Sequence, residues 1–443
     1  MPTPSTRTIQ PGAGDRMRSW LTSRSAFVRL VMWVVAIVAT LGASLWWYGS
    51  TEPDTFSREA AIALLGAVVT LLSAAVVATL ALVQQLRRAR EVETLTRFAE
   101  DSRRLRSLRV GRMEIPGIVV VASGNNHLEW TDRADVEFED WAAERPLDEE
   151  VRQVIDARIP GFVEEARRRK SPFSDDPAVD LVDARVELRP DASGKRRPVY
   201  RLTPAPMTYF PFFATAARLD DAALDDPRPL RERFGPDVRS IEDVARLRLN
   251  AKVGVGTLVV TSDDRLVLGV RGRTMIAGGD ERTDGRSAVH VVAEGAMPHD
   301  VDRKGRFDPL ATARRGLMEE VGLGGDVRAI GWVRQLVQTG FFLDQQRWQP
   351  CFANLAHIDL SWDEFATAAT TAQDRWEVER YVSLPFHIEH PGLRLLLLGQ
   401  HPDLALASNH AAAVLWFGLL YRHGFTTMRD MLARPVDEKL LVS

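Results

Sequence analysis

The chain has 443 residues, a formal net charge of −3 and a single cysteine, Cys351. A near-neutral charge lacks the basic surplus of nucleic-acid-binding proteins, so we expect no nucleic-acid partner. One cysteine excludes an intrachain disulfide and any zinc or redox motif built on paired cysteines.

Two apolar stretches without charged residues lie near the N-terminus, from Leu30 to Tyr48 and from Ala60 to Val83. About 20 apolar residues in a helix cross the roughly 30 Å hydrocarbon core of a bilayer, and both stretches reach that length. Neither shows the polar stripe that is usual for a buried helix of a soluble protein. The sequence therefore predicts two transmembrane helices within residues 26–86, preceded by a disordered cytoplasmic tail over residues 1–25.

Charges beside these stretches predict the orientation of the hairpin. Arginines cluster before the first stretch and after the second, whereas the connection over residues 49–59 is slightly acidic. By the positive-inside rule, both termini and the soluble part are expected in the cytoplasm, with the lipid bilayer as a partner. The compact loops and the Ala- and Arg-rich composition favour a bacterial inner membrane. Gly66, Thr70 and Ala74 repeat a small residue at every fourth position, which would permit a homo-oligomer through close helix packing.

The soluble part is predicted to be α+β. Residues 87–112 predict a helical juxtamembrane linker. Residues 113–250 predict an α+β region that leads into the next domain. Its expected elements are a strand over 115–122, a helix over 147–169 and a strand over 179–188.

Residues 251–430 predict a mixed sheet flanked by helices, followed by a tail over residues 431–443. Asp308 as cap, Pro309 in the first turn and Gly322 as stop signal favour a helix over 308–321. The other expected strands are 253–261, 266–271, 287–293, 327–337 and 351–358, and the other expected helices are 363–372, 391–399 and 404–423.

The end of the helix over 308–321 contains a motif. Residues 315–323 read Arg-Gly-Leu-Met-Glu-Glu-Val-Gly-Leu. This segment resembles the end of the box of the Nudix hydrolase superfamily, which reads Arg-Glu-apolar-X-Glu-Glu-X-Gly-apolar. The order of strands, loop and helix before it is similar too, and the resemblance covers roughly residues 250–400. It implies a Nudix-like fold and hydrolysis of a nucleoside-diphosphate-linked substrate.

The resemblance also implies a metal site on this helix. Carboxylates that share one helix face hold Mg²⁺ or Mn²⁺ beside a diphosphate, and the metal activates water. Glu319 and Glu320 are the implied metal ligands. Glu320 and Arg315 are the implied catalytic residues, and Arg315 orients a glutamate of the box.

This box is degenerate at two positions. Gly316 stands where the family has a metal-binding glutamate, and Phe307 stands where another glutamate precedes the helix. Gly295 serves as the box glycine if the intervening loop is lengthened. Glu294 is a candidate for a replacement carboxylate, and Glu377 or Glu379 is a candidate for a more distal one.

Three functions stay open at this point. The first is a membrane-anchored Nudix-type hydrolase. The second is a catalytically impaired nucleotide sensor that signals at the membrane, and the third is a membrane scaffold that docks a protein partner. The aromatic run of Tyr209, Phe210, Phe212 and Phe213 is expected in the core, with a place in the wall of a nucleotide pocket as the alternative.

Overall fold

The computed structural model describes residues 94–132, 135–190, 196–223, 226–235, 238–272, 285–322, 332–372 and 377–436, and isolated positions between 42 and 81. The chain divides into two compact units, Met1–Thr94 and Leu95–Ser443. In the first unit the isolated positions are helical. The predicted ends of the two apolar helices lie outside the described residues: Leu30, Tyr48, Ala60 and Val83. In the part of the chain that is described, no helix is long and apolar enough to cross a membrane.

The predicted linker over residues 87–112 is helical only in part. Residues 94–105 are helical, but Arg106 has a φ of +52° and the helix ends there. Strands β1 (Ser107–Val110) and β2 (Met113–Pro116) then form a hairpin around Gly111, whose φ is +59°. The prediction of a helix to residue 112 is wrong because alternate residues of this segment are buried in the core, which an extended hairpin achieves.

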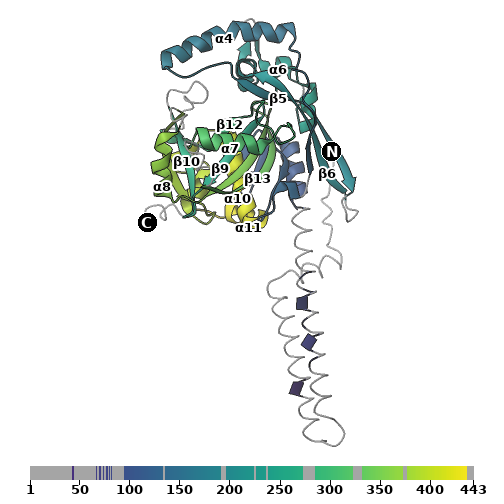
Figure 1. Cartoon of the computed structure of the whole chain (residues 1–443), viewed down its shortest axis with the longest axis vertical. Helices are drawn as coiled ribbons and strands as arrows, with labels where there is room; N and C mark the ends of the chain where they lie inside the picture. The colour runs from purple at the N-terminus through teal and green to yellow at the C-terminus, as the bar shows by residue number, and fades with distance from the viewer. Residues whose placement is uncertain are drawn as a thin grey trace, which may run out of the picture. The chain divides into compact units, whose positions relative to one another are not determined.

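A mixed sheet of nine described strands forms the centre of the second unit (Figure 1). The strand order is β16–β11–β10–β9–β14–β13–β3, and β12 also pairs with β9 and β15 with β10. The strands are β3 (Ile118–Ser123), β9 (Gly254–Val260), β10 (Arg265–Arg271), β11 (Ser287–His290), β12 (Val292–Gly295), β13 (Val333–Asp344), β14 (Gln349–Ile358), β15 (Val378–Pro385) and β16 (Leu404–Leu406). Because β3 belongs to this sheet, the segment before residue 250 contributes to the same core as the segment after it.

Helices cover both faces of the large sheet, which confirms the predicted α+β class with helices flanking a sheet (Figure 1). On one face lie α7 (Pro309–Glu319) and α8 (Trp362–Ala368). On the other lie α9 (Pro391–Leu397), α10 (Asn409–His423) and α11 (Phe425–Ala433). Successive side chains of β9 alternate between the two faces of the sheet. Val259 packs against α7 and α8, whereas Leu258 and Val260 pack in the cluster that contains α10.

A smaller sheet of order β4–β6–β5 lies beside the large one. Its strands are β4 (Asp135–Phe138), β5 (Pro177–Pro190) and β6 (Arg196–Thr208), and its helices are α4 (Glu149–Arg169), α5 (Tyr209–Ala214) and α6 (Leu230–Phe234). The short strands β7 (Ala222–Ala223) and β8 (Asp226–Pro229) form a separate pair. The Val179 amide donates to the Ala296 carbonyl and the Val253 amide donates to the Val179 carbonyl, so β5 is tied directly to the large sheet.

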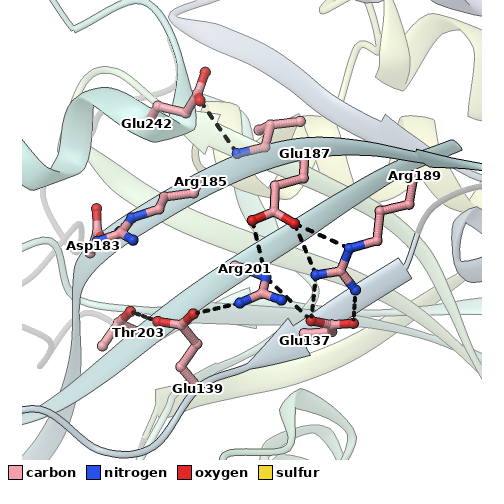
Figure 2. A network of polar contacts seen from close by, with 10 residues as sticks. Glu137, Glu139, Asp183, Arg185, Glu187, Arg189, Arg201, Thr203 and Glu242 are labelled. Atoms are coloured by element: carbon pink, nitrogen blue, oxygen red, sulfur yellow. Dashed lines mark hydrogen bonds and ion pairs between the residues drawn. The ribbon is translucent and has the colours of Figure 1, made fainter. Parts of the chain in front are cut away.

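Ion pairs join β4, β5 and β6 in the smaller sheet (Figure 2). Arg189 lies 2.7 Å from Glu137 and 2.9 Å from Glu187, and Arg201 lies 3.3 Å from Glu187. These side chains are 36–45% exposed. Solvent-exposed pairs contribute about 1 kcal/mol or less each, so this network has little weight in the stability of the fold.

Three predicted elements divide differently in the structure. The strand predicted over 115–122 is interrupted at Gly117, between β2 and β3. The strand predicted over 287–293 is two strands, because β11 pairs with β10 whereas β12 pairs with β9. The helix predicted over 404–423 begins only at Asn409, since residues 404–406 form β16. The Ser408 hydroxyl accepts a hydrogen bond from the Ala411 amide and caps α10 there.

Gly256 of β9 allows α10 to approach the sheet. A methyl group there would lie 2.4 Å from Val414 Cγ2 and 2.9 Å from His410 Nε2. We expect Gly256→Ala to lower the free energy of unfolding by about 1–3 kcal/mol through overpacking, measured by urea denaturation. Gly161→Ala is the control, because its methyl group would meet nothing within 4 Å and alanine favours a helix. Equal effects of the two substitutions would contradict this account.

Candidate functional site

A cavity of about 300 Å³ opens at one edge of the large sheet. Strands β9 and β10 are antiparallel and β14 runs parallel to β9, so the start of β9, the end of β10 and the start of β14 meet at this edge. Lys252, Arg271 and Arg347 lie at these three points and all line the cavity. The strand order thus gathers three cationic side chains from distant parts of the sequence.

Lys252 faces the aromatic wall of the cavity. Its Nζ lies 4.5 Å from the ring centre of Tyr209 and 5.6 Å from that of Phe212. Within the described residues, the ammonium group has no hydrogen bond and no ion pair. Burial lowers the pKa of Lys252 to about 8; the charge of Glu294 opposes this shift and that of Arg347 adds to it. Lys252 is therefore a cation held on aromatic faces and open to an anionic ligand.

The predicted aromatic run lies partly in the core and partly in the wall of the cavity. Phe212 and Phe213 are buried, as core residues are, and with Tyr209 they also line the cavity. Phe210 instead stacks on Phe173, with ring centres 4.8 Å apart and an angle of 19° between the ring planes. Burial raises the pKa of Tyr209 to about 12, so its hydroxyl stays protonated at neutral pH.

Arg315 organises the carboxylates around α7. Its guanidinium binds both oxygens of Asp300 at 3.1 Å and lies 3.0 Å from Glu319 and 3.1 Å from Glu294. It also donates to the Gly295 carbonyl at 2.6 Å. Burial by itself would lower the pKa of Arg315, but the bond to Asp300 and the charge of Glu294 raise it above its ordinary value. The predicted contact of Arg315 with a box glutamate is present, and the glutamate is Glu319.

Glu294 of β12 fills the space beside Gly316. A methyl group on Gly316 would lie 3.1 Å from Glu294 Cβ and 3.3 Å from Val292 Cγ1. Burial raises the pKa of Glu294, the charge of Arg315 opposes this, and the charge of Glu319 adds to it. Glu294, one of the predicted replacement carboxylates, thus lies beside Gly316 and is paired with Arg315.

Glu320 is turned away from Arg315. Its Oε1 accepts a hydrogen bond from the Ala293 amide at 3.0 Å. It lines a second cavity, of about 20 Å³, that shares Arg271 and Glu377 with the larger one. Burial, followed by the charges of Glu377 and Glu294, raises the pKa of Glu320 well above its ordinary value. The structure thus places Glu319 and Glu320 in two different environments.

The implied Mg²⁺ or Mn²⁺ does not fit this arrangement of side chains. Glu319 is bound by Arg315, Glu320 by a backbone amide, and Gly316 has no side chain to offer. Phe307 is buried in an aromatic cluster, with its ring centre 5.0 Å from that of Phe138. Among the residues that the structure describes, no three His, Cys, Asp or Glu side chains are placed to share one metal ion.

His290 completes the wall of the cavity near α10. Its Nδ1 lies 2.6 Å from the Val291 carbonyl, which only accepts, so Nδ1 carries the proton and Nε2 is free to accept from the Ser408 hydroxyl at 3.3 Å. Burial, followed by the charge of Arg271, holds the pKa of His290 well below its ordinary value. His290 is therefore a neutral, satisfied residue.

Sequence reasoning did not identify the cationic residues of the cavity. Lys252, Arg271 and Arg347 belong to no motif and are separated by long stretches of chain, and only the strand order unites them. Asp300, the bidentate partner of Arg315, was missed for the same reason. The sequence matches no model of a known protein family, and no curated protein is similar enough to count as a relative.

Proposed function

We propose that the second unit is a Nudix-like domain that binds a nucleoside diphosphate or one of its derivatives in the larger cavity. One observation carries this proposal: Lys252, Arg271 and Arg347 line the same cavity as the aromatic side chains of α5. Cationic groups bind phosphate oxygens, and aromatic faces accept a base or another planar ring. The resemblance of residues 315–323 to the Nudix box supports the same ligand class.

We also propose that the two apolar stretches near the N-terminus anchor the protein in a membrane. The two apolar stretches and the arginines beside them support a transmembrane hairpin in a bacterial inner membrane with a cytoplasmic second unit. Nucleotides are abundant in the cytoplasm. A domain that is tethered to the bilayer and binds a nucleotide is suited to report that ligand at the membrane, as a sensor does.

Calorimetric titration of the full chain in lipid nanodiscs tests the binding. We expect saturable binding of at least one member of a panel of nucleoside diphosphates and their sugar derivatives. Arg347→Gln should weaken it about tenfold or more, because a desolvated charge contact to a phosphate is lost. Arg303→Gln is the control, since Arg303 is exposed on the loop before α7. Absence of binding across the whole panel would reject the proposal. The remaining candidate function would then be a membrane scaffold that docks a protein partner.

Hydrolysis of the same ligand is a second candidate, favoured by Glu320. A buried carboxylate whose pKa is raised by burial and by Glu377 is typical of a catalytic acid or base. Product release is followed in the same samples with Mg²⁺ or Mn²⁺ present. Turnover that is lost in Glu320→Gln would establish the hydrolase, whereas binding without product would favour the sensor.

A further inference from the structure

We propose that the cavity holds the phosphate groups of its ligand through Lys252 and Arg347, assisted by Arg271, and does so without a divalent cation. This inference rests on the proposed function and specifies how the ligand's charge is neutralised. The Nudix resemblance implies the opposite, namely a metal ion held by carboxylates beside the diphosphate.

The cationic side chains of the cavity differ in their partners. Neither Lys252 nor Arg347 has a side-chain hydrogen bond or ion pair within the described part of the chain. Arg271 is offset by Glu377 at 3.9 Å. Glu294 and Glu377 also line the cavity, but Glu294 pairs with Arg315 and Glu377 with Arg271. Lys252 and Arg347 are therefore left without a directly paired carboxylate, and an anionic ligand would stabilise them.

The carboxylates around α7 already have a cationic partner. Glu294 and Glu319 both contact the guanidinium of Arg315 at 3.0–3.1 Å, and its strongest partner, Asp300, is 3% exposed. A divalent ion would have to displace this guanidinium before it gained those ligands. Arg315 thus already supplies the positive charge that these carboxylates require.

A divalent cation in the cavity would lie beside Lys252 and Arg347, whose charges are not paired with a carboxylate and therefore disfavour it. A diphosphate in the same place would meet complementary charges. The cavity therefore favours binding of a diphosphate over binding of a divalent cation.

Titration of the full chain in nanodiscs with ADP as the probe, once in EDTA and once in excess Mg²⁺, tests the inference. We expect the two dissociation constants to agree within about threefold. Lys252→Met should weaken ADP binding about tenfold or more, equivalent to about 1.4 kcal/mol. Lys304→Met, in an exposed loop, is the matched control and should bind as the unmodified chain does.

The pH dependence of binding provides an independent readout. Lys252 faces Glu294, Glu377, Arg347 and Arg315, and its pKa of about 8 means that the free ammonium loses its proton just above neutral pH. ADP affinity should therefore fall as the pH rises through that value. Lys252→Arg, which keeps its charge, should bind ADP with a flatter pH profile. Retention of binding in this variant would show that a positive charge at position 252 is sufficient for ADP binding.

The outcomes separate this inference from the proposed function. Binding that is lost in EDTA and restored by Mg²⁺ would overturn the inference and leave the proposed function intact. Unchanged binding by Lys252→Met would also overturn it. Failure of the whole nucleotide panel, with and without metal, would overturn both.

Discussion

Replacement of Arg315 by methionine is expected to lower the free energy of unfolding by about 3–5 kcal/mol. Arg315 neutralises three carboxylates at once, and two of them, Asp300 and Glu294, are 3% and 16% exposed. Methionine keeps most of the volume but leaves these buried negative charges without a cation. The large effect therefore comes from uncompensated charge and not from a cavity.

Urea denaturation of the full chain measures this effect, and the adjacent residue provides the control. Arg314 is 55% exposed and lies 3.8 Å from Asp308, so Arg314→Met should change the stability by less than about 1 kcal/mol. The loss in Arg315→Met should shrink at acidic pH, because protonation of the carboxylates removes the unpaired charge. A loss in Arg315→Met as small as in the control would contradict the described cluster.

Substitution of Asp180 by alanine is expected to cost about 3–5 kcal/mol as well. Asp180 is fully buried and accepts from Arg145 Nε at 2.8 Å, from Asn250 at 2.9 Å and from the Ala251 amide at 2.7 Å. Removal of the carboxylate leaves the guanidinium of Arg145 buried with only backbone carbonyls as partners. It also loosens the link between β5 and the chain entering β9, beside Lys252.

Asp183→Ala on the same strand is the control for Asp180→Ala. Asp183 is 26% exposed and pairs with Arg185, which is 70% exposed, so its loss should cost less than about 1 kcal/mol. Thermal unfolding compares the two variants. A similar midpoint for both would show that the buried pair adds nothing beyond a surface pair, contrary to this prediction.

Local signals predicted many elements close to their observed bounds. Asp308 caps α7 and Pro309 begins it, as their residue types indicate. The strands around residues 254–260 and 265–271 follow from short β-rich runs joined by a turn. These predictions succeeded because caps, turns and side-chain periodicity act over a few residues. The β1–β2 hairpin and the division between β11 and β12 depend on partner strands far along the chain.

The contacts of the candidate site likewise divide into local contacts, which the sequence predicts, and long-range contacts, which it does not. The contact between Arg315 and Glu319 follows from their spacing of four residues on a helix. The contacts of Arg315 with Asp300 and Glu294 cross a loop and a strand, so no helical spacing predicts them. The contact of Glu320 was also beyond the motif, because the partner of its carboxylate is an amide of β12.

The sequence by itself determined the α+β class, the position of helix α7 and the pairing of Arg315 with a glutamate of that helix, because each depends on local spacing. Its prediction of a membrane hairpin also rests on local composition alone and stays a prediction. Only the tertiary structure decided where the positive charge of the site lies. Strand order brings Lys252, Arg271 and Arg347 to one edge of the sheet, and burial then sets how strongly each charge acts.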